Sequence, residues 1–322
     1  MNDFEKIIES IQKADTFLLV AHQKPDGDAA GSVTATACGL KSIGKKVDLY
    51  LETPMESNLQ FLTEAVPICT NIAAHYDVLM YLDCSTPDYA VLPPVEFTYD
   101  QTIVIDHHIS NKGFGDLNWV EEVSATGELV YRLLEGLNIP LDETMANAIY
   151  TAISTDTGGF TFSDLSRDTF RIIGELYNVR KSYTALAKSL HDVQSYEQMK
   201  LQGLAYDSLT LYAEGQIACV TLTFKDIERY GGHANIPNPV MNIGVNVSGV
   251  AMGVTFKENQ DGTYRVSLRS NEPWPVDVSI PALKYGGGGH YRAAGFTYKG
   301  TPEDLITELT EYYNLCMETK HE

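Results

Sequence analysis

The feature that most constrains the fold is a set of short apolar runs, each long enough for one β-strand. They are Phe17–Ala21, Val47–Leu51, Val78–Leu82 and Ile103–Ile105. The first, third and fourth are almost continuously apolar, which is typical of strands covered on both faces of a parallel sheet. The N-terminal part of the chain is therefore expected to contain an open, mostly parallel sheet.

Helical patterns alternate with these runs. Apolar side chains recur at helical spacing within residues 4–13, and residues 29–43, 126–137 and 143–154 are further helix candidates. Alternation of strands and helices indicates an open sheet flanked by helices, so the expected fold class is α/β.

The character of the chain changes after a largely helical region, residues 166–205. Three strand candidates follow at 216–224, 250–258 and 263–269, then a Gly-rich loop at 285–290, a short strand near 295–298 and a final helix from about 302. A length of 322 residues also favours two domains over one. The predicted division is a first domain over 1–185, a helical connector over 186–205 and a smaller α/β domain over 206–322.

Composition excludes several classes of protein. The net charge of −20 argues against binding of long duplex or single-stranded nucleic acid, which needs a basic face. Five cysteines, without a C-x-x-C pair, argue against a disulfide framework and a structural zinc site. The chain has neither a signal-peptide pattern nor a long apolar segment, so a cytoplasmic location without a membrane partner is expected.

Carboxylate and imidazole side chains follow three of the strand-like runs and end the helix candidate at 143–154. They are His22, Asp26, Asp28, Asp83, Asp106, His107, His108 and Asp156. Each has a simpler explanation when taken alone, such as a helix cap or a turn at a strand end. Because ligands of open parallel sheets bind at the carboxyl ends of the strands, these side chains are expected to converge. Their common edge predicts a metal site.

Charge balance favours two cations at that edge. Asp26, Asp28, Asp83 and Asp156 would repel one another, and two divalent ions would offset their four charges, with one aspartate bridging. Mixed carboxylate and imidazole ligands suit manganese, ahead of cobalt or magnesium. Cys84 follows Asp83 directly and should face the other side of the sheet. Two such ions can activate a water molecule and clamp a phosphate ester.

The motifs that carry these residues resemble those of the DHH phosphoesterase superfamily. His22–Ser32, Leu82–Cys84, Asp106–His108 and Ser154–Phe160 resemble its N-terminal motifs, in order. Gly286–His290 resembles the mark of the DHH-associated C-terminal domain, so the resemblance covers nearly the whole chain. The two-domain form is similar to bacterial oligoribonucleases (nano-RNases) that also remove the 3′-phosphate of 3′-phosphoadenosine 5′-phosphate (pAp).

The resemblance implies a role for each metal-site residue. His22, Asp26 and Asp83 would hold one ion, and the second would be held by Asp28, Asp83, His107 and Asp156. Asp83 would bridge the ions and share the catalytic role with His108, which would lie near the scissile phosphate. Asp106 would orient His107. Ile109 stands where relatives commonly carry proline, which affects the stiffness of the loop and not the ligands.

Substrate recognition is expected in the second domain. The resemblance implies that Arg269 and His290 grip the substrate, and consecutive glycines at Gly287, Gly288 and Gly289 could close backbone N–H groups around an anion. An anion grip combined with metals would select a short substrate, so we expect hydrolysis of RNA of roughly two to five nucleotides, linear dinucleotides included, to 5′-mononucleotides. Dephosphorylation of pAp is a second expected reaction.

Three alternatives stay open at this point. A polyphosphatase or inorganic pyrophosphatase would use the same N-terminal motifs, although the pyrophosphatases pair them with a different second domain. A cyclic-dinucleotide phosphodiesterase normally carries membrane and sensory segments. A nucleotide-binding regulatory protein without catalysis would be expected to lack a metal ligand, yet every ligand position is filled. The sequence is compatible with a homodimer.

Overall fold

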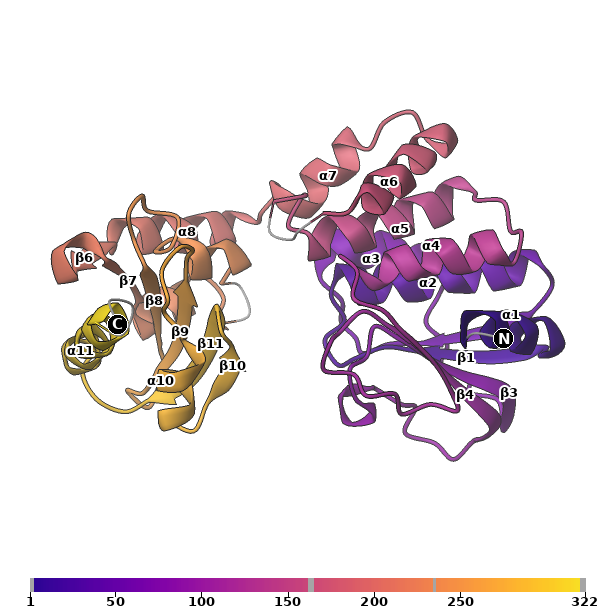
Figure 1. Cartoon of the computed structure of the whole chain (residues 1–322), viewed down its shortest axis with the longest axis horizontal. Coiled ribbons are helices and arrows are strands. Elements are labelled where there is room, and N and C mark those ends of the chain that lie inside the picture. The colour runs from indigo at the N-terminus through magenta and orange to yellow at the C-terminus, as the bar shows by residue number, and fades with distance from the viewer. Residues whose placement is uncertain (1–2, 162–164, 234–235, 319–322) are drawn as a thin grey trace. The chain divides into compact units, whose positions relative to one another are not determined.

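The structure, a computed structural model, describes residues 3–161, 165–233 and 236–318. It contains two compact units, Met1–Val193 and Gln194–Glu322 (Figure 1). The helical character expected for 166–205 is confirmed by helices α6 (Arg167–Val179), α7 (Thr184–His191) and α8 (Tyr196–Asp207). The expected connector is divided, since α7 belongs to the first unit and α8 to the second. Within the described residues, no helix is long and apolar enough to cross a membrane.

The first unit is built on a five-stranded parallel sheet with the order β2-β1-β3-β4-β5. Its strands are β1 (Thr16–Val20), β2 (Lys46–Tyr50), β3 (His75–Leu82), β4 (Thr98–Asp106) and β5 (Leu117–Val120). The open parallel sheet and its first four strands are confirmed. The edge strand β5 was not predicted, because its short sequence, LNWV, shows no clear apolar pattern.

Helices cover one face of this sheet and loops cover the other. Helices α1 (Asp3–Lys13), α2 (Gly27–Ser42), α4 (Thr126–Gly136) and α5 (Glu143–Asp156) share the main core with the strand residues that point toward them, and α2, α4 and α5 lie together in Figure 1. The opposite face buries Leu18, Leu79 and Val104 against loop residues that include Phe97 and Phe114. Cys84 packs on that opposite face, as expected.

Helices α2 and α5 approach each other closely because α2 carries glycine where they meet. A Cβ atom at Gly31 would lie 2.4 Å from the carbonyl oxygen of Ala148, and one at Gly27 would lie 2.3 Å from the hydroxyl of Thr155. Such distances are shorter than any van der Waals contact, so a side chain at either glycine would push the helices apart. The approach brings the start of α2 next to the end of α5.

The second unit contains a six-stranded mixed sheet with the order β10-β11-β9-β8-β7-β6. The strands are β6 (Thr210–Tyr212), β7 (Ile217–Leu222), β8 (Met252–Glu258), β9 (Tyr264–Ser270), β10 (Gly288–His290) and β11 (Ala293–Tyr298). One face packs against α11 (Pro302–Glu318), and the other is partly covered by α8 and α9 (Phe224–Arg229). This smaller α/β unit was predicted, apart from strands β6 and β10.

The Gly-rich stretch expected to be a loop at 285–290 is in part a strand, which corrects the prediction. Helix α10 (Ser279–Lys284) leads into it, and β10 then pairs antiparallel with β11. A Cβ atom at Gly287 would lie 2.2 Å from the carbonyl oxygen of Gly295, and Gly289 has a φ of 147°. Close packing of the hairpin and an unusual backbone angle therefore account for two of the glycines.

Candidate active site

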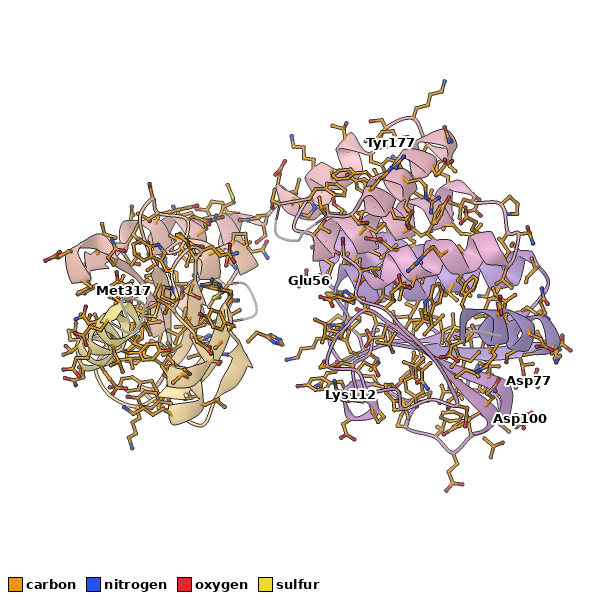
Figure 2. All side chains as sticks on the ribbon, viewed as in Figure 1. Glu56, Asp77, Asp100, Lys112, Tyr177 and Met317 are labelled. Carbon is orange, nitrogen blue, oxygen red and sulfur yellow. The ribbon has the colours of Figure 1, made fainter. Side chains whose placement is uncertain are left out.

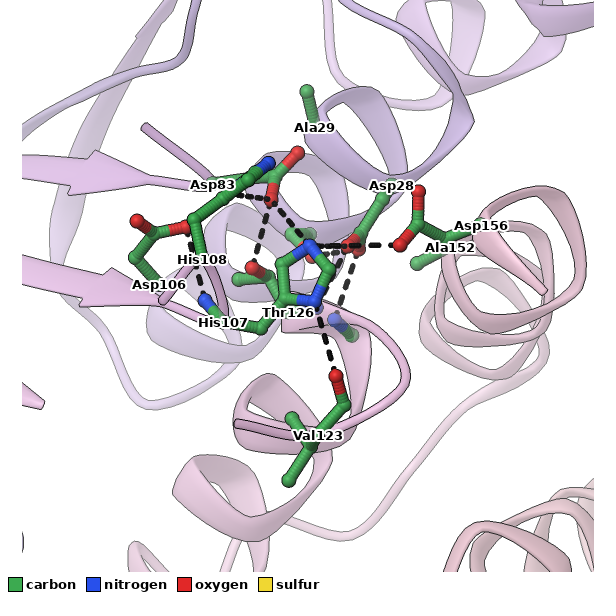
Figure 3. A network of polar contacts seen from close by, with 12 residues as sticks. Asp28, Ala29, Asp83, Asp106, His107, His108, Val123, Thr126, Ala152 and Asp156 are labelled. Atoms are coloured by element: carbon green, nitrogen blue, oxygen red, sulfur yellow. Dashed lines mark hydrogen bonds and ion pairs between the residues drawn. The ribbon is translucent and has the colours of Figure 1, made fainter. Parts of the chain in front are cut away.

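The strand order places a switch point between β1 and β3, where the crevice of an open α/β sheet normally binds its ligand. His22 lies just beyond β1, and Asp83 directly follows β3. Strand β4 ends at Asp106 and leads into His107, and α5 ends at Asp156. The expected convergence of these side chains at one edge of the sheet is therefore seen in the structure. Figure 3 shows Asp83, His107 and Asp156 of this cluster.

Asp83 lies at the centre of the cluster, and its two oxygens face different partners. Oδ2 is 3.5 Å from Nε2 of His22, whereas Oδ1 is 3.6 Å from Nε2 of His107. Oδ1 also accepts a hydrogen bond of 2.9 Å from the Thr126 hydroxyl. The backbone of Asp83 has a φ of 55°, a left-handed conformation that is uncommon outside glycine and tends to occur at functional sites. This buried carboxylate has the geometry of a bridge.

Three groups of possible metal ligands meet around Asp83. Two of them include Asp83 itself, one with His22 and Asp26 and one with His107 and His108, and the third consists of Asp28, His107 and Asp156. His107 Nε2 lies 3.5 Å from Asp156 Oδ2 and 3.8 Å from Asp28 Oδ2. These distances are longer than the ~2.9 Å between the heavy atoms of a hydrogen bond. They are close to the distance between two ligand atoms that bind the same cation through bonds of ~2.1 Å.

Asp28 is buried and is held by the start of helix α4. Its oxygens accept hydrogen bonds from the backbone N–H groups of Thr126 (2.6 Å) and Gly127 (2.9 Å), and from the Ser32 hydroxyl. The positive end of a helix stabilises a carboxylate in this position. Burial and the neighbouring carboxylates of Asp83 and Asp156 nevertheless raise the pKa of Asp28 well above its ordinary value.

Asp156 experiences the same repulsion. Burial, with the neighbouring carboxylates of Asp83 and Asp26, raises its pKa to about 6 although His107 acts in the opposite direction. Carboxylates that resist ionisation together need a compensating positive charge, and among the described residues their ion-pair partners are histidines. The donor set therefore fits divalent cations, which would remove the repulsion.

The position of Asp26 is compatible with two roles that are alternatives when the sequence is considered alone, a helix cap and a metal ligand. Its Oδ1 caps helix α2 by accepting hydrogen bonds from the N–H groups of Asp28 and Ala29, both at 3.1 Å. The same oxygen lies 3.8 Å from Nε2 of His22. Although burial acts in the opposite direction, His22 and the backbone donors lower the pKa of Asp26. A helix cap and a metal ligand are therefore compatible at this position.

The partner of Asp106 differs from the prediction. Its Oδ1 accepts a hydrogen bond from the backbone N–H of His107 at 2.9 Å and lies 2.8 Å from ring Nδ1 of His108. The ring Nδ1 of His107 instead lies 3.0 Å from the carbonyl oxygen of Val123 (Figure 3). The expectation that Asp106 orients the His107 ring is therefore wrong, because that ring turns toward the loop before α4 while its Nε2 faces the carboxylates.

His108 is the ring that Asp106 orients. The hydrogen bond to Asp106 raises the pKa of His108, and Asn111 holds the other Asp106 oxygen through its side-chain amide at 2.7 Å. Nδ1 of His108 is also 3.7 Å from Asp83 Oδ1, so the ring borders the cluster while its side chain remains 43% exposed. A partly exposed imidazole that retains its proton can contact an incoming phosphate.

Three residues that support the site were missed by the sequence analysis. Thr126 holds Asp28 and Asp83, Val123 orients His107, and Asn111 fixes Asp106. Only Thr126 offered a signal, since it begins a predicted helix and a helix start supplies free N–H groups. A valine carbonyl has no signature in the sequence.

Another group of possible ligands, His75, Asp77 and Asp100, lies at the opposite end of the sheet, and Figure 2 labels its two aspartates. His75 and Asp100 are exposed, whereas Asp77 is partly buried. Asp77 Oδ2 accepts hydrogen bonds from the N–H groups of Asp15 and Thr16, which explains its position as support for the start of β1. We do not assign this group to the active site.

In the second unit, Arg269 and His290 lie on one face of the sheet. His290 pairs with Ala293, which pairs in turn with Arg269, and residues directly opposite in antiparallel strands share a face. Gly287 packs against β11, as does Gly289, whereas a side chain at Gly288 would meet open space. The structure thus places Arg269 and His290 on the same sheet face, on either side of β11, and gives a packing reason for two of the three glycines.

The domains of this chain match a known family. Residues 16–153 match the N-terminal domain of the DHH family, and residues 216–319 match the DHHA1 domain. The chain belongs to the DHH family, and membership of this family identifies it as a phosphoesterase.

Among curated relatives, the chain is 29% identical over 323 residues to the bifunctional oligoribonuclease and PAP phosphatase NrnA of Bacillus subtilis, covering 97% of this chain and 98% of the relative. It is also 29% identical to NrnA of Thermus thermophilus, covering 90% of this chain and 86% of the relative. The structure of an exopolyphosphatase-related protein from Bacteroides fragilis superposes with a TM-score of 0.83 at 23% identity, over 99% of this chain and 98% of that one. This last similarity shows a shared fold.

Proposed function

We propose that this protein hydrolyses short oligoribonucleotides of roughly two to five nucleotides, linear dinucleotides included, to 5′-mononucleotides, and removes the 3′-phosphate of pAp, with two divalent cations at the Asp83 cluster. The observation that carries the proposal is that the two oxygens of Asp83 face separate groups of ligands. The NrnA relatives, named for these two activities, support the choice of substrates.

The residues present fit two cations. His22 and Asp26 would hold one, and Asp28, His107 and Asp156 the other, with Asp83 shared between them. Four aspartates balance the charge of two divalent ions, and the mixture with imidazole favours manganese over magnesium or calcium. When bound, such ions lower the pKa of a water molecule and offset the charge that develops on phosphoryl oxygens.

The protein's own residues would position the ligands and a proton donor. The N–H groups of α4 hold Asp28, and the Val123 carbonyl turns Nε2 of His107 toward the carboxylates. Asp106 fixes the ring of His108 and favours its protonated form. His108 can therefore hydrogen bond a phosphate oxygen, or donate its proton to the leaving ribose oxygen.

The net negative charge of the chain favours a short substrate. A long strand gains affinity from many phosphate contacts, and a chain with a net charge of −20 offers few. We assign substrate binding to Arg269 and His290, with the backbone of Gly287–Gly289, because the two side chains share one sheet face. A small group of cationic side chains suits a nucleotide with one or two phosphates better than a polymer.

A panel of substrates tests this proposal. The manganese-loaded protein would be given 5′-labelled RNAs from dinucleotides to much longer strands, together with pAp, pyrophosphate and polyphosphate. We expect fastest turnover of the dinucleotides and measurable release of phosphate from pAp. A clear preference for pyrophosphate or polyphosphate would overturn the choice of substrate, and no hydrolysis at all would indicate a nucleotide-binding regulatory protein.

The bridging role is tested by Asp83→Asn, which keeps the size of the side chain and removes its charge. We expect kcat/KM for a dinucleotide to fall on the order of 10³-fold, because this carboxylate would serve both cations. Bound manganese, measured by elemental analysis, should fall in parallel, while circular dichroism stays unchanged. Asp100→Asn, at the opposite end of the same sheet, is the matched control. Near-normal activity in Asp83→Asn would contradict the bridge.

A further inference from the structure

Strands β8 and β9 divide their side chains sharply between two faces. Val254 opposite Leu268, and Phe256 opposite Val266, point into the core beside α11. On the other face Gly253 lies opposite Arg269, Thr255 opposite Ser267, and Lys257 opposite Arg265. Lys257 therefore belongs to the face that carries Arg269 and, through Ala293, His290.

Lys257 is a buried ammonium, and its polar contacts within the described residues are with neutral groups. Its residue is only 8% exposed, and its Nζ contacts the sulfur of Met241 at 3.4 Å and the hydroxyl of Ser267 at 3.3 Å. Among the residues that the structure describes, no carboxylate pairs with it. Both contacts are weak for a charged donor, which normally forms hydrogen bonds of about 2.7–2.9 Å. Buried charges are normally paired, so an uncompensated one needs an explanation.

The charged groups that most affect Lys257 are cationic. Burial, together with the like charges of Arg265 and Arg269, lowers the pKa of Lys257 to about 8. Burial also lowers the pKa of Arg269. Three cationic side chains therefore share one sheet face in a chain whose net charge is −20. An anionic ligand would offset this local excess of positive charge.

On the side of β11, the same face carries small residues. Ala293 and Gly295 of that strand lie opposite Arg269 and Ser267, and neither carries a bulky side chain. Nζ of Lys257 reaches toward Ser267, which lies between Arg265 and Arg269 along β9. The ammonium and the Arg269 guanidinium therefore border the same stretch of sheet.

We propose that Lys257 is a phosphate-binding residue of the second unit, whose ammonium takes a phosphate oxygen of the nucleotide substrate beside Arg269. This inference rests on the proposed function and extends its substrate surface beyond Arg269 and His290. The bound phosphate supplies the negative charge that Lys257 lacks among its contacts in the described residues. A lysine kept unpaired in the free protein is then explained by its role in the complex.

Lys257→Met tests the proposal in the full-length, manganese-loaded protein. Methionine resembles lysine in length and fits the apolar contact with Met241. We expect KM for a dinucleotide to rise about tenfold with kcat within about twofold, since a charge-assisted hydrogen bond is lost from binding and not from chemistry. The melting temperature should rise, because a buried unpaired charge is removed. If Lys257 only supported the fold, the substitution would lower the melting temperature instead.

Binding of AMP, measured by calorimetry, provides a readout that does not depend on turnover. We expect Lys257→Met and Lys257→Gln to weaken it about tenfold, as Arg269→Ala should, while Lys299→Met, an exposed lysine of the same unit, leaves it unchanged. Unchanged AMP affinity in both Lys257 variants would overturn the inference. If the wild-type protein bound AMP but hydrolysed no substrate, the proposed function would fail while the role of Lys257 would still be decided.

Discussion

At the scale of single residues, the site depends on groups that are not themselves expected ligands. The Asp28 carboxylate is enclosed by protein, and the N–H groups of Thr126 and Gly127 hold it from a different helix. The Thr126 hydroxyl reaches Asp83 at the same time. Thr126 therefore fixes the position of the Asp28 carboxylate relative to that of Asp83. Repulsion between the like charges of these two groups would otherwise push them apart.

Thr126→Val isolates the hydroxyl from the backbone donor. Valine has the shape of threonine and keeps the N–H that Asp28 accepts, but it loses the hydrogen bond to Asp83. We expect manganese affinity to fall about tenfold, since groups that orient metal ligands typically contribute 10–100-fold. Titration calorimetry would measure this, with Thr126→Ser as the control that keeps the hydroxyl. Equal affinity in all three proteins would show that Asp83 needs no such support.

At the scale of elements, the contact between α2 and α5 positions the cluster. Asp28 lies in the first turn of α2, and Asp156 is the last residue of α5. The two helices meet through Gly27 and Gly31, which face Thr155 and the Ala148 carbonyl. The distance between these helix ends, and therefore between the two carboxylates, is set by residues that have no chemistry of their own.

Gly31→Ala should separate the two helices. Its methyl group would overlap a backbone oxygen that cannot move independently, so we expect a loss of about 1–3 kcal/mol in the free energy of unfolding. Activity should fall as well, because Asp28 moves with α2. Urea denaturation and kcat/KM provide the measurements. Gly174→Ala in α6, where a Cβ atom meets nothing within 4 Å, is the control and should gain up to ~1 kcal/mol. Wild-type stability in Gly31→Ala would mean that α2 can shift freely.

At the scale of the whole molecule, the two units have separate cores, and the proposed metal and substrate residues are divided between them. The candidate metal ligands all lie in Met1–Val193, and the expected substrate residues all lie in Gln194–Glu322. Metal binding and phosphate binding should therefore stabilise different units, because a ligand stabilises only the folded state that it binds.

Calorimetry of the full chain should separate the two effects. Adding manganese should raise the melting temperature of one transition by several degrees, since the cations remove repulsion among buried carboxylates, and a chelator should reverse this. The second transition should not respond to metal. In Asp83→Asn, manganese should shift the melting temperature of that transition much less than in the wild-type protein. A shift of both transitions in equal measure would indicate that the two units unfold together.

The sequence by itself determined the architecture of the first unit and the residues of the cluster. Apolar runs of strand length and the Asp and His residues that follow them are local features, and the rule that parallel strands end at one edge converts them into a site. The strands β1, β3 and β4 and the ligands around Asp83 follow from this reasoning. The short strands β5 and β10 do not, because their pairing depends on neighbours distant in the chain.

Only the tertiary structure decided how the side chains are oriented. The hydrogen bond between Thr126 and Asp28 joins residues 98 positions apart, and the choice of His108 over His107 as the partner of Asp106 depends on a ring rotation. Burial of Lys257 beneath Met241 likewise follows from packing and not from pattern. Local periodicity encodes which face a residue occupies, but orientation and pairing arise from contacts that form only when distant segments pack together.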